Sequence, residues 1–129
     1  MKFLIVDDDE FNRLVLSQYL NDIAKKLEKQ IEIIEAIDGS NAVEIYSNEG
    51  ADFVVMDMTM PVMGGYEACE KINKINDKCP IYILSAVAKR GEIEEIMKRG
   101  LAVHHAYKTG DFDRVAQEVW NLAEKYNAL

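Results

Sequence analysis

The sequence predicts an α/β fold, a doubly wound parallel sheet of five strands with five helices on its two faces. Five short apolar runs alternate with five segments whose apolar residues recur at three- and four-residue steps. All seven glycines and both prolines fall at the expected turns or element ends. The length of 129 residues, with 49% hydrophobic and 29% charged, suits one domain around one core.

The five expected strands are short and rich in β-branched or aromatic residues. The first of them is an unbroken apolar run, which is typical of a strand that is buried on both faces, as in a parallel sheet. In chain order they are residues 3–6, 31–37, 53–56, 81–84 and 103–107. The third run ends at Asp57, Pro80 precedes the fourth, and Lys108 ends the fifth.

The five expected helices follow the strands, and each has an apolar stripe. The first runs to about Lys29, the second lies between Asp38 and Gly50, and the fourth closes at Gly100. On the fourth, Glu94 with Lys98 and Glu95 with Arg99 are expected to pair on the solvent side. The stripes are Phe11, Leu14, Val15, Tyr19, Leu20, Ile23 and Leu27; Ala42, Val43 and Tyr46; Tyr66, Cys69, Ile72 and Ile75; Ile93, Ile96 and Met97; and Val115, Val119, Leu122, Ala123 and Tyr126.

Polar residues stand where four of the strands end. Parallel α/β sheets bind ligands beyond the carboxyl ends of their strands, so these residues are expected to meet at one edge. They are Asp7 and Asp8, Asp57, Ser85 and Lys108.

This set of side chains predicts phosphoryl chemistry. Three carboxylates without Cys or well-spaced His form a hard oxygen site for Mg²⁺ or Mn²⁺. Lys108 and the Ser85 hydroxyl supply a positive charge and a donor for phosphoryl oxygens. Asp57, which follows an apolar strand and opens a loop, is the candidate nucleophile that forms an acyl phosphate.

Composition excludes several classes of function. The 15 basic and 23 acidic residues give a net charge of −8 and alternate along the chain, which disfavours direct nucleic-acid binding. The apolar runs are too short for membrane insertion, and the N-terminus has no signal-peptide pattern, so a cytoplasmic location is expected. Cys69 and Cys79 lie ten residues apart without His companions and are expected to be reduced thiols.

Three segments resemble a known family. Residues 3–13 contain the first strand and acid pair, residues 38–44 the start of the second helix, and residues 56–68 the Asp-x-x-Met-Pro segment that begins at Asp57. In this order they resemble the receiver domains of two-component response regulators, including those of hybrid kinases and phosphorelays. The resemblance implies a flavodoxin-like strand order 2-1-3-4-5 and one receiver domain over residues 1–129 without an output domain.

The resemblance also implies roles. Asp57 would accept phosphate from the phosphohistidine of a sensor histidine kinase or a histidine phosphotransfer protein. Asp7, Asp8, Asp57 and the main-chain carbonyl of Thr59 would hold Mg²⁺, and Ser85 and Lys108 would bind phosphoryl oxygens. Ser85 and His105 would form the conformational switch that a downstream target protein reads. The expected chemistry is self-catalysed acceptance and slow autodephosphorylation, with no other enzymatic activity.

The sequence departs from the family pattern at two positions. Thr109 follows Lys108 where the family usually has a cis proline, so this loop is either trans and differently shaped or strained. His105 stands where the family usually has Tyr or Phe, and its charge can change near pH 7.

Two other functions remain open at this point. A haloacid dehalogenase-like phosphatase would use an Asp-x-Asp pattern, which Asp7 and Asp9 formally match, but no later acidic pair and no cap domain are evident. A receiver-like interaction module that is never phosphorylated is favoured by Thr109 and disfavoured by the intact acidic set. Onward phosphate relay and direct control of a target also remain alternatives.

Overall fold

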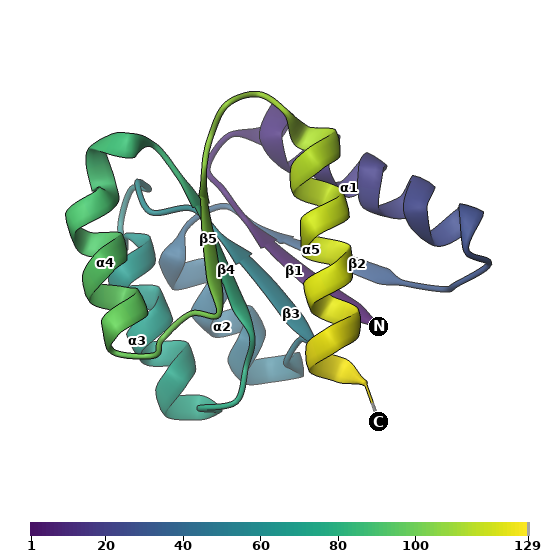
Figure 1. The fold of residues 1–129 in the computed structure, drawn as a ribbon. Coiled ribbons are helices and arrows are strands. Elements are labelled where there is room, and N and C mark those ends of the chain that lie inside the picture. Colours follow the sequence, from purple (N-terminus) through teal and green to yellow (C-terminus); the bar gives the residue numbers. More distant parts are fainter. Residues whose placement is uncertain (129) are drawn as a thin grey trace.

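The computed structural model describes residues 1–128, and its centre is a parallel sheet of five strands between two layers of helices (Figure 1). The strands are β1 (Lys2–Val6), β2 (Glu32–Ala36), β3 (Phe53–Met56), β4 (Ile81–Ser85) and β5 (His104–Tyr107). Their order is β2-β1-β3-β4-β5, and every neighbouring pair is parallel. The predicted fold class and strand order are therefore confirmed.

Five helices and one short 3₁₀ helix cover the sheet. They are α1 (Glu10–Lys26), α2 (Gly39–Glu49), α3 (Gly65–Ile75), η1 (Val87–Lys89), α4 (Arg90–Lys98) and α5 (Phe112–Asn127). Helices α1 and α5 cover one face, and α2, α3 and α4 cover the other (Figure 1). None of the helices in residues 1–128 has the length and apolar character that a membrane span requires.

Alternation along the strands divides the core between the two faces. In β1, Phe3 and Ile5 pack toward α1 and α5, whereas Leu4 and Val6 pack toward α2, α3 and α4. On the first side Trp120 of α5 is buried and stacks on Phe3, with ring centroids 6.0 Å apart. Both faces of β1 are thus buried, as its unbroken apolar run predicts.

The face that α1 buries differs from the predicted stripe. Phe11 and Leu14 are 64% and 59% exposed. Leu20 of the predicted stripe is buried, but the other buried residues of the helix are Leu16, Ser17 and Ala24, which lie outside the stripe. Because α1 begins at the carboxyl edge of the sheet, its first turns have little of the sheet beneath them. The helix also ends at Lys26 rather than near Lys29, since Glu28 adopts a left-handed φ of 55° that cannot continue it.

Neither of the two ion pairs expected on α4 is present among the described residues. Arg99, paired with Glu95 in the sequence prediction, binds Glu70 of α3 at 2.7 Å and the hydroxyl oxygen of Tyr66 at 2.9 Å. The helix ends at Lys98, so Arg99 lies in the capping turn. The contact ties α4 to α3.

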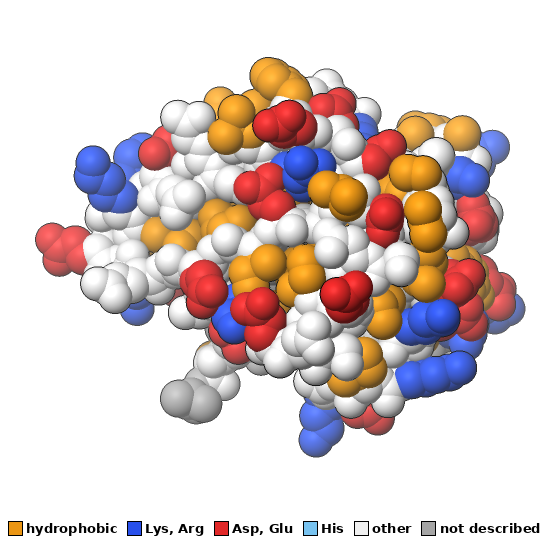
Figure 2. All heavy atoms as spheres, turned by 180° about the vertical axis from the view of Figure 1, so that it is seen from behind, with side chains coloured by type: hydrophobic (Ala, Val, Ile, Leu, Met, Phe, Trp, Pro, Cys, Tyr) orange, Lys and Arg blue, Asp and Glu red, His pale blue; other side chains and the backbone are white. Residues whose placement is uncertain are grey.

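Figure 2 shows how charged and hydrophobic side chains are distributed on one face of the molecule. On the face shown in Figure 2, acidic and basic side chains are interspersed, and hydrophobic side chains form several separate groups. With a net charge of −8, this face offers no broad basic area among the described residues.

Candidate functional site

Three carboxylates meet at the carboxyl edge of the sheet. Asp7 and Asp8 follow β1, and Asp57 follows the neighbouring strand β3. One oxygen from each lies within 4.8 Å of the others. Asp7 and Asp57 are each 5% exposed, whereas Asp8 is open to solvent. The parallel topology therefore brings together the acidic residues that the sequence singles out.

Lys108 reaches this cluster from the end of β5. Its Nζ lies 3.0 Å from Oδ2 of Asp7 and 3.3 Å from Oδ1 of Asp57. Its amide donates to the carbonyl oxygen of Ser85 at 2.8 Å, which extends the pairing of β5 with β4 by one residue. No peptide bond within residues 1–128 is cis, so the bond between Lys108 and Thr109 is trans. The lysine reaches the carboxylates without the family's usual proline.

The surroundings shift two of these groups. Burial raises the pKa of Asp57 above its ordinary value, and the nearby Asp7 adds to the rise although Lys108 opposes it. For Lys108, burial acts to lower the pKa, but the hydrogen bond to Asp7 and the charges of both carboxylates outweigh it and raise the pKa. The lysine is therefore charged, and it partly neutralises the acids.

The loop after β3 fixes the backbone around Asp57. The amide of Met58 donates to Oδ1 of Asp57 at 2.8 Å, and the amide of Gly65 donates to the Met58 carbonyl at 3.0 Å. A Cβ at position 65 would overlap the carbonyl oxygen of Asp57. Glycine at 65 thus allows α3 to begin directly against the candidate nucleophile.

The other predicted site residues differ in how far they are buried. Ser85 ends β4 next to β3, is fully buried, and its hydroxyl has no partner among the described residues. Thr59 is exposed in the loop two residues beyond Asp57. His105 is half-buried on β5, and its ring meets the edge of Tyr107 with centroids 5.9 Å apart.

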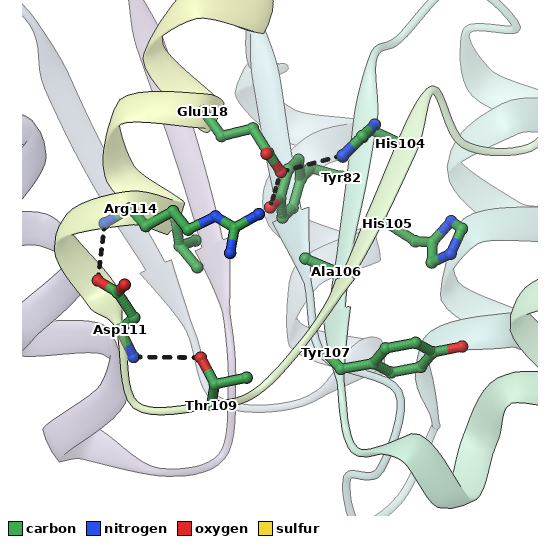
Figure 3. A pocket seen from close by; sticks show the side chains of 10 residues that line it. Tyr82, His104, His105, Ala106, Tyr107, Thr109, Asp111, Arg114 and Glu118 are labelled. Carbon is green, nitrogen blue, oxygen red and sulfur yellow. Dashed lines mark hydrogen bonds and ion pairs between the residues drawn. The ribbon is translucent and has the colours of Figure 1, made fainter.

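A separate cavity of about 270 Å³ lies between β5 and α5 (Figure 3). Within it, Oε1 of Glu118 accepts a hydrogen bond from the Tyr82 hydroxyl at 2.5 Å and lies 3.0 Å from Nε2 of His104. His105 and Tyr107 point away from Glu118, on the other side of the strand (Figure 3). The two histidines thus face opposite sides of β5, and none of the three clustered carboxylates lines this cavity.

Sequence reasoning missed two residues that touch the cluster. Nδ2 of Asn12 lies 3.3 Å from Oδ2 of Asp7, and Nη1 of Arg13 lies 2.8 Å from the Asp7 carbonyl oxygen. Both residues lie in the first turn of a helix that begins just after the acid pair. That position is the signal that could have identified them.

The donor set fits a hard divalent cation. Carboxylate oxygens are the ligands that Mg²⁺ prefers, and Mg²⁺ is commonly held by one or two carboxylates together with water and phosphate. Among residues 1–128, no cysteine or histidine belongs to the cluster. Asp8, which is exposed, leaves the group open toward solvent and a ligand.

Comparison with known proteins agrees with the fold. The chain is 35% identical over 95 residues to the autoinducer 1 sensor kinase/phosphatase LuxN of Vibrio harveyi, a match of 74% of this chain and about a tenth (10%) of that protein. It is 37% identical over 99 residues to the chemotaxis protein CheY of Thermotoga maritima, which covers 77% of this chain and 78% of CheY.

A solved structure extends the likeness over the fold. The CheX–CheY–BeF₃–Mg²⁺ complex from Borrelia burgdorferi matches with a TM-score of 0.81 and 28% identity over 95% of this chain and 88% of that one. The profile described as the response regulator receiver domain matches residues 3–119. The chain therefore belongs to the family of response regulator receiver domains.

Proposed function

We propose that this receiver domain accepts phosphate on Asp57 with the help of Mg²⁺ and passes the signal on through protein contacts. The observation that carries the proposal is the meeting of Asp7, Asp8 and Asp57 within 4.8 Å, with Lys108 bound to two of them. A cluster of acids that includes two buried carboxylates, with a lysine alongside, suits transfer of a negatively charged phosphoryl group.

In the proposed reaction an oxygen of Asp57 attacks the phosphorus of a phosphohistidine. The P–N bond breaks, the imidazole nitrogen keeps the electron pair, and the product is an acyl phosphate. Asp7, Asp8 and the Thr59 carbonyl would hold the cation, which when bound neutralises charge on the carboxylate and phosphoryl oxygens. Lys108 and the unpartnered Ser85 hydroxyl would donate to those oxygens.

The phosphate donor and the receiver of the signal follow from this chemistry. The donor would be a sensor histidine kinase or a histidine phosphotransfer protein, and a downstream target would read the switch at Ser85 and His105. We expect the domain to act in the cytoplasm, where ATP-dependent kinases form phosphohistidine. Its own chemistry would be limited to acceptance and slow loss of phosphate.

One contact disfavours a phosphatase of the Asp-x-Asp type. Such an enzyme would need Asp9 to face the reacting group. Asp9 instead caps α1, and its side chain accepts a hydrogen bond from the amide of Phe11 at 2.9 Å. The cluster therefore contains Asp57 in place of the second acid of that pattern.

Intact mass after incubation with acetyl phosphate tests the proposal. The parent protein with Mg²⁺ should gain a single labile phosphoryl group, and both Asp57→Asn and a metal-free sample should gain none. An adduct retained by Asp57→Asn would contradict the assignment of the nucleophile. The absence of any adduct, with both acetyl phosphate and a phosphorylated histidine kinase as donors, would favour the unphosphorylated interaction module.

A further inference from the structure

Asp7 is held from several directions by the start of α1. Its Oδ1 accepts from the amide of Asp9 at 2.9 Å, while Nδ2 of Asn12 lies 3.3 Å from its Oδ2. Its carbonyl oxygen accepts from Nη1 of Arg13 at 2.8 Å. The first turn of α1 therefore contacts both the side chain and the main chain of one cluster residue.

Arg13 itself is anchored on a third element. Its Nε lies 3.0 Å from Oε1 of Glu35 on β2, and its side chain is only 12% exposed. The amide of Asp7 donates to the carbonyl oxygen of Ala36, the next residue of β2, at 3.2 Å. The peptide units on both sides of Asp7 are thus tied to β2, one directly and the other through the guanidinium of Arg13.

These contacts constrain the direction in which the Asp7 carboxylate points. Mg²⁺ demands near-ideal octahedral geometry with short bonds, whereas Ca²⁺ accepts variable geometry and longer bonds. Groups that orient metal ligands without touching the metal are commonly worth about 10- to 100-fold in metal affinity. A ligand fixed at both its backbone and its carboxylate is therefore suited to the stricter ion.

We propose that Asn12 and Arg13 are positioning residues that hold Asp7 in the geometry Mg²⁺ requires, and that Glu35 anchors Arg13 for this purpose. The inference rests on the proposed function, since it assumes that the cluster binds Mg²⁺. To that function the inference adds which residues set the affinity of the site for Mg²⁺ and its selectivity over Ca²⁺.

The positive charge of Arg13 is expected to weaken Mg²⁺ binding, whereas its hydrogen bond to Asp7 is expected to strengthen it. A guanidinium next to the acidic cluster repels a divalent cation, so removal of the charge alone should tighten Mg²⁺ binding. Arg13→Lys keeps the charge but lacks the planar fork that reaches the Asp7 carbonyl and Glu35 together. Asn12→Ala removes the amide without any change in charge. These two variants isolate orientation from electrostatics.

The experiment measures dissociation constants for Mg²⁺ and for Ca²⁺ by calorimetric titration of the full chain. Arg13→Lys and Asn12→Ala should each raise the Mg²⁺ constant by about tenfold and the Ca²⁺ constant by less than about threefold. The matched controls are Arg99→Lys, which alters an Arg–Glu pair between α3 and α4, and Asn21→Ala, on an exposed position of α1. Both controls should bind as the parent does.

A double-mutant cycle tests whether Glu35 anchors Arg13. Glu35→Gln alone should weaken Mg²⁺ binding several-fold, because Arg13 loses its charged partner. In the Arg13→Lys background the same change should have a smaller effect, since the connection is already broken. Metal-free thermal unfolding of each variant confirms that it is folded. Asn12→Ala and Glu35→Gln keep the inference testable if Arg13→Lys does not fold.

Three results would overturn the inference. Mg²⁺ constants within twofold of the parent in Asn12→Ala and Arg13→Lys would remove the positioning role. Equal shifts for Mg²⁺ and Ca²⁺ in these two variants would show that the contacts do not favour the ion with the stricter geometry, and would remove the proposed role in selectivity. A parent protein that binds no Mg²⁺ would overturn the proposed function itself, and the positioning role with it, so the two failures are distinguishable.

Discussion

At Asp57, burial and the neighbouring charges oppose each other. The carboxyl group is 5% exposed beside Asp7, and its pKa is raised even though Lys108 lies 3.3 Å away. The ionised form that a nucleophile needs is thus disfavoured by the fold that positions it. Active sites often carry such a local cost to stability.

This conflict predicts that Asp57→Asn stabilises the metal-free protein at pH 7. Because the folded pKa lies above the unfolded value of 3.8, the folded state holds its proton more tightly. The contribution of Asp57 to the free energy of unfolding is therefore fully present below pH 3.8 and is lost as the pH rises through the folded pKa. Asparagine at position 57 does not titrate, so the variant does not lose stability in this way as the pH rises. Urea denaturation over a pH series checks this, and a parent as stable as Asp57→Asn at pH 7 would contradict it.

The close approach of α3 to Asp57 depends on glycine at 65. An added Cβ would overlap the Asp57 carbonyl oxygen, so Gly65→Ala should cost about 1–3 kcal/mol in the free energy of unfolding. Gly91→Ala is the matched control, since a Cβ there meets nothing within 4 Å and the residue lies in α4. The control should leave stability unchanged or slightly higher. Equal effects of the two substitutions on denaturant midpoints would contradict the account.

Among the elements, α1 has two different apolar surfaces. Leu16 is 2% exposed, whereas Leu14 is 59% exposed on the same helix. Leu16→Ala should lower the free energy of unfolding by about 2–5 kcal/mol because it leaves a cavity. Leu14→Ala should change it by less than about 0.5 kcal/mol. Chemical denaturation of both variants decides the matter, and a large loss with Leu14→Ala would mean that the buried face of α1 is assigned wrongly.

The strands were predictable and some details of the helices were not. A strand buried on both faces is a short unbroken apolar run, so residues 53–56 could be bounded at both ends from the sequence. On α1 the apolar residues extend round more than one side, and only packing against the sheet and α5 decides which are covered. The turn at Glu28 and the contact from Arg99 to Glu70 depend on local strain and tertiary proximity, which residue spacing does not encode.

Across the sheet as a whole, the meeting of Asp7, Asp8 and Asp57 was predictable because topology determines it. Parallel strands place their carboxyl ends at one edge, so acids that follow the first and third strands must lie near each other. Asn12 and Arg13 were not predictable in the same way. Arg13 acts on a main-chain carbonyl and on Glu35 of another strand, and neither partner carries a sequence pattern that marks the contact.

Cation binding should couple to global stability. A ligand that binds only the folded state at 100 times its dissociation constant adds about 2.7 kcal/mol to the free energy of unfolding. Saturating Mg²⁺ should therefore stabilise the parent by roughly this amount, and Asp8→Asn should lose most of the gain because it removes a carboxylate from the cluster. Asp22→Asn, on an exposed position of α1, should retain it. Denaturation with and without Mg²⁺ measures the difference, and an undiminished gain in Asp8→Asn would exclude that carboxylate as a ligand.

Reductive trapping identifies the residue that carries the phosphate, which we propose to be Asp57. Borohydride reduces an acyl phosphate to the alcohol and releases phosphate, so a phosphorylated aspartate becomes homoserine. Peptide mass mapping after phosphorylation with Mg²⁺ and reduction should find homoserine at position 57 and unaltered aspartate at 7 and 8. Homoserine at position 7 or 8, with Asp57 unchanged, would contradict the account.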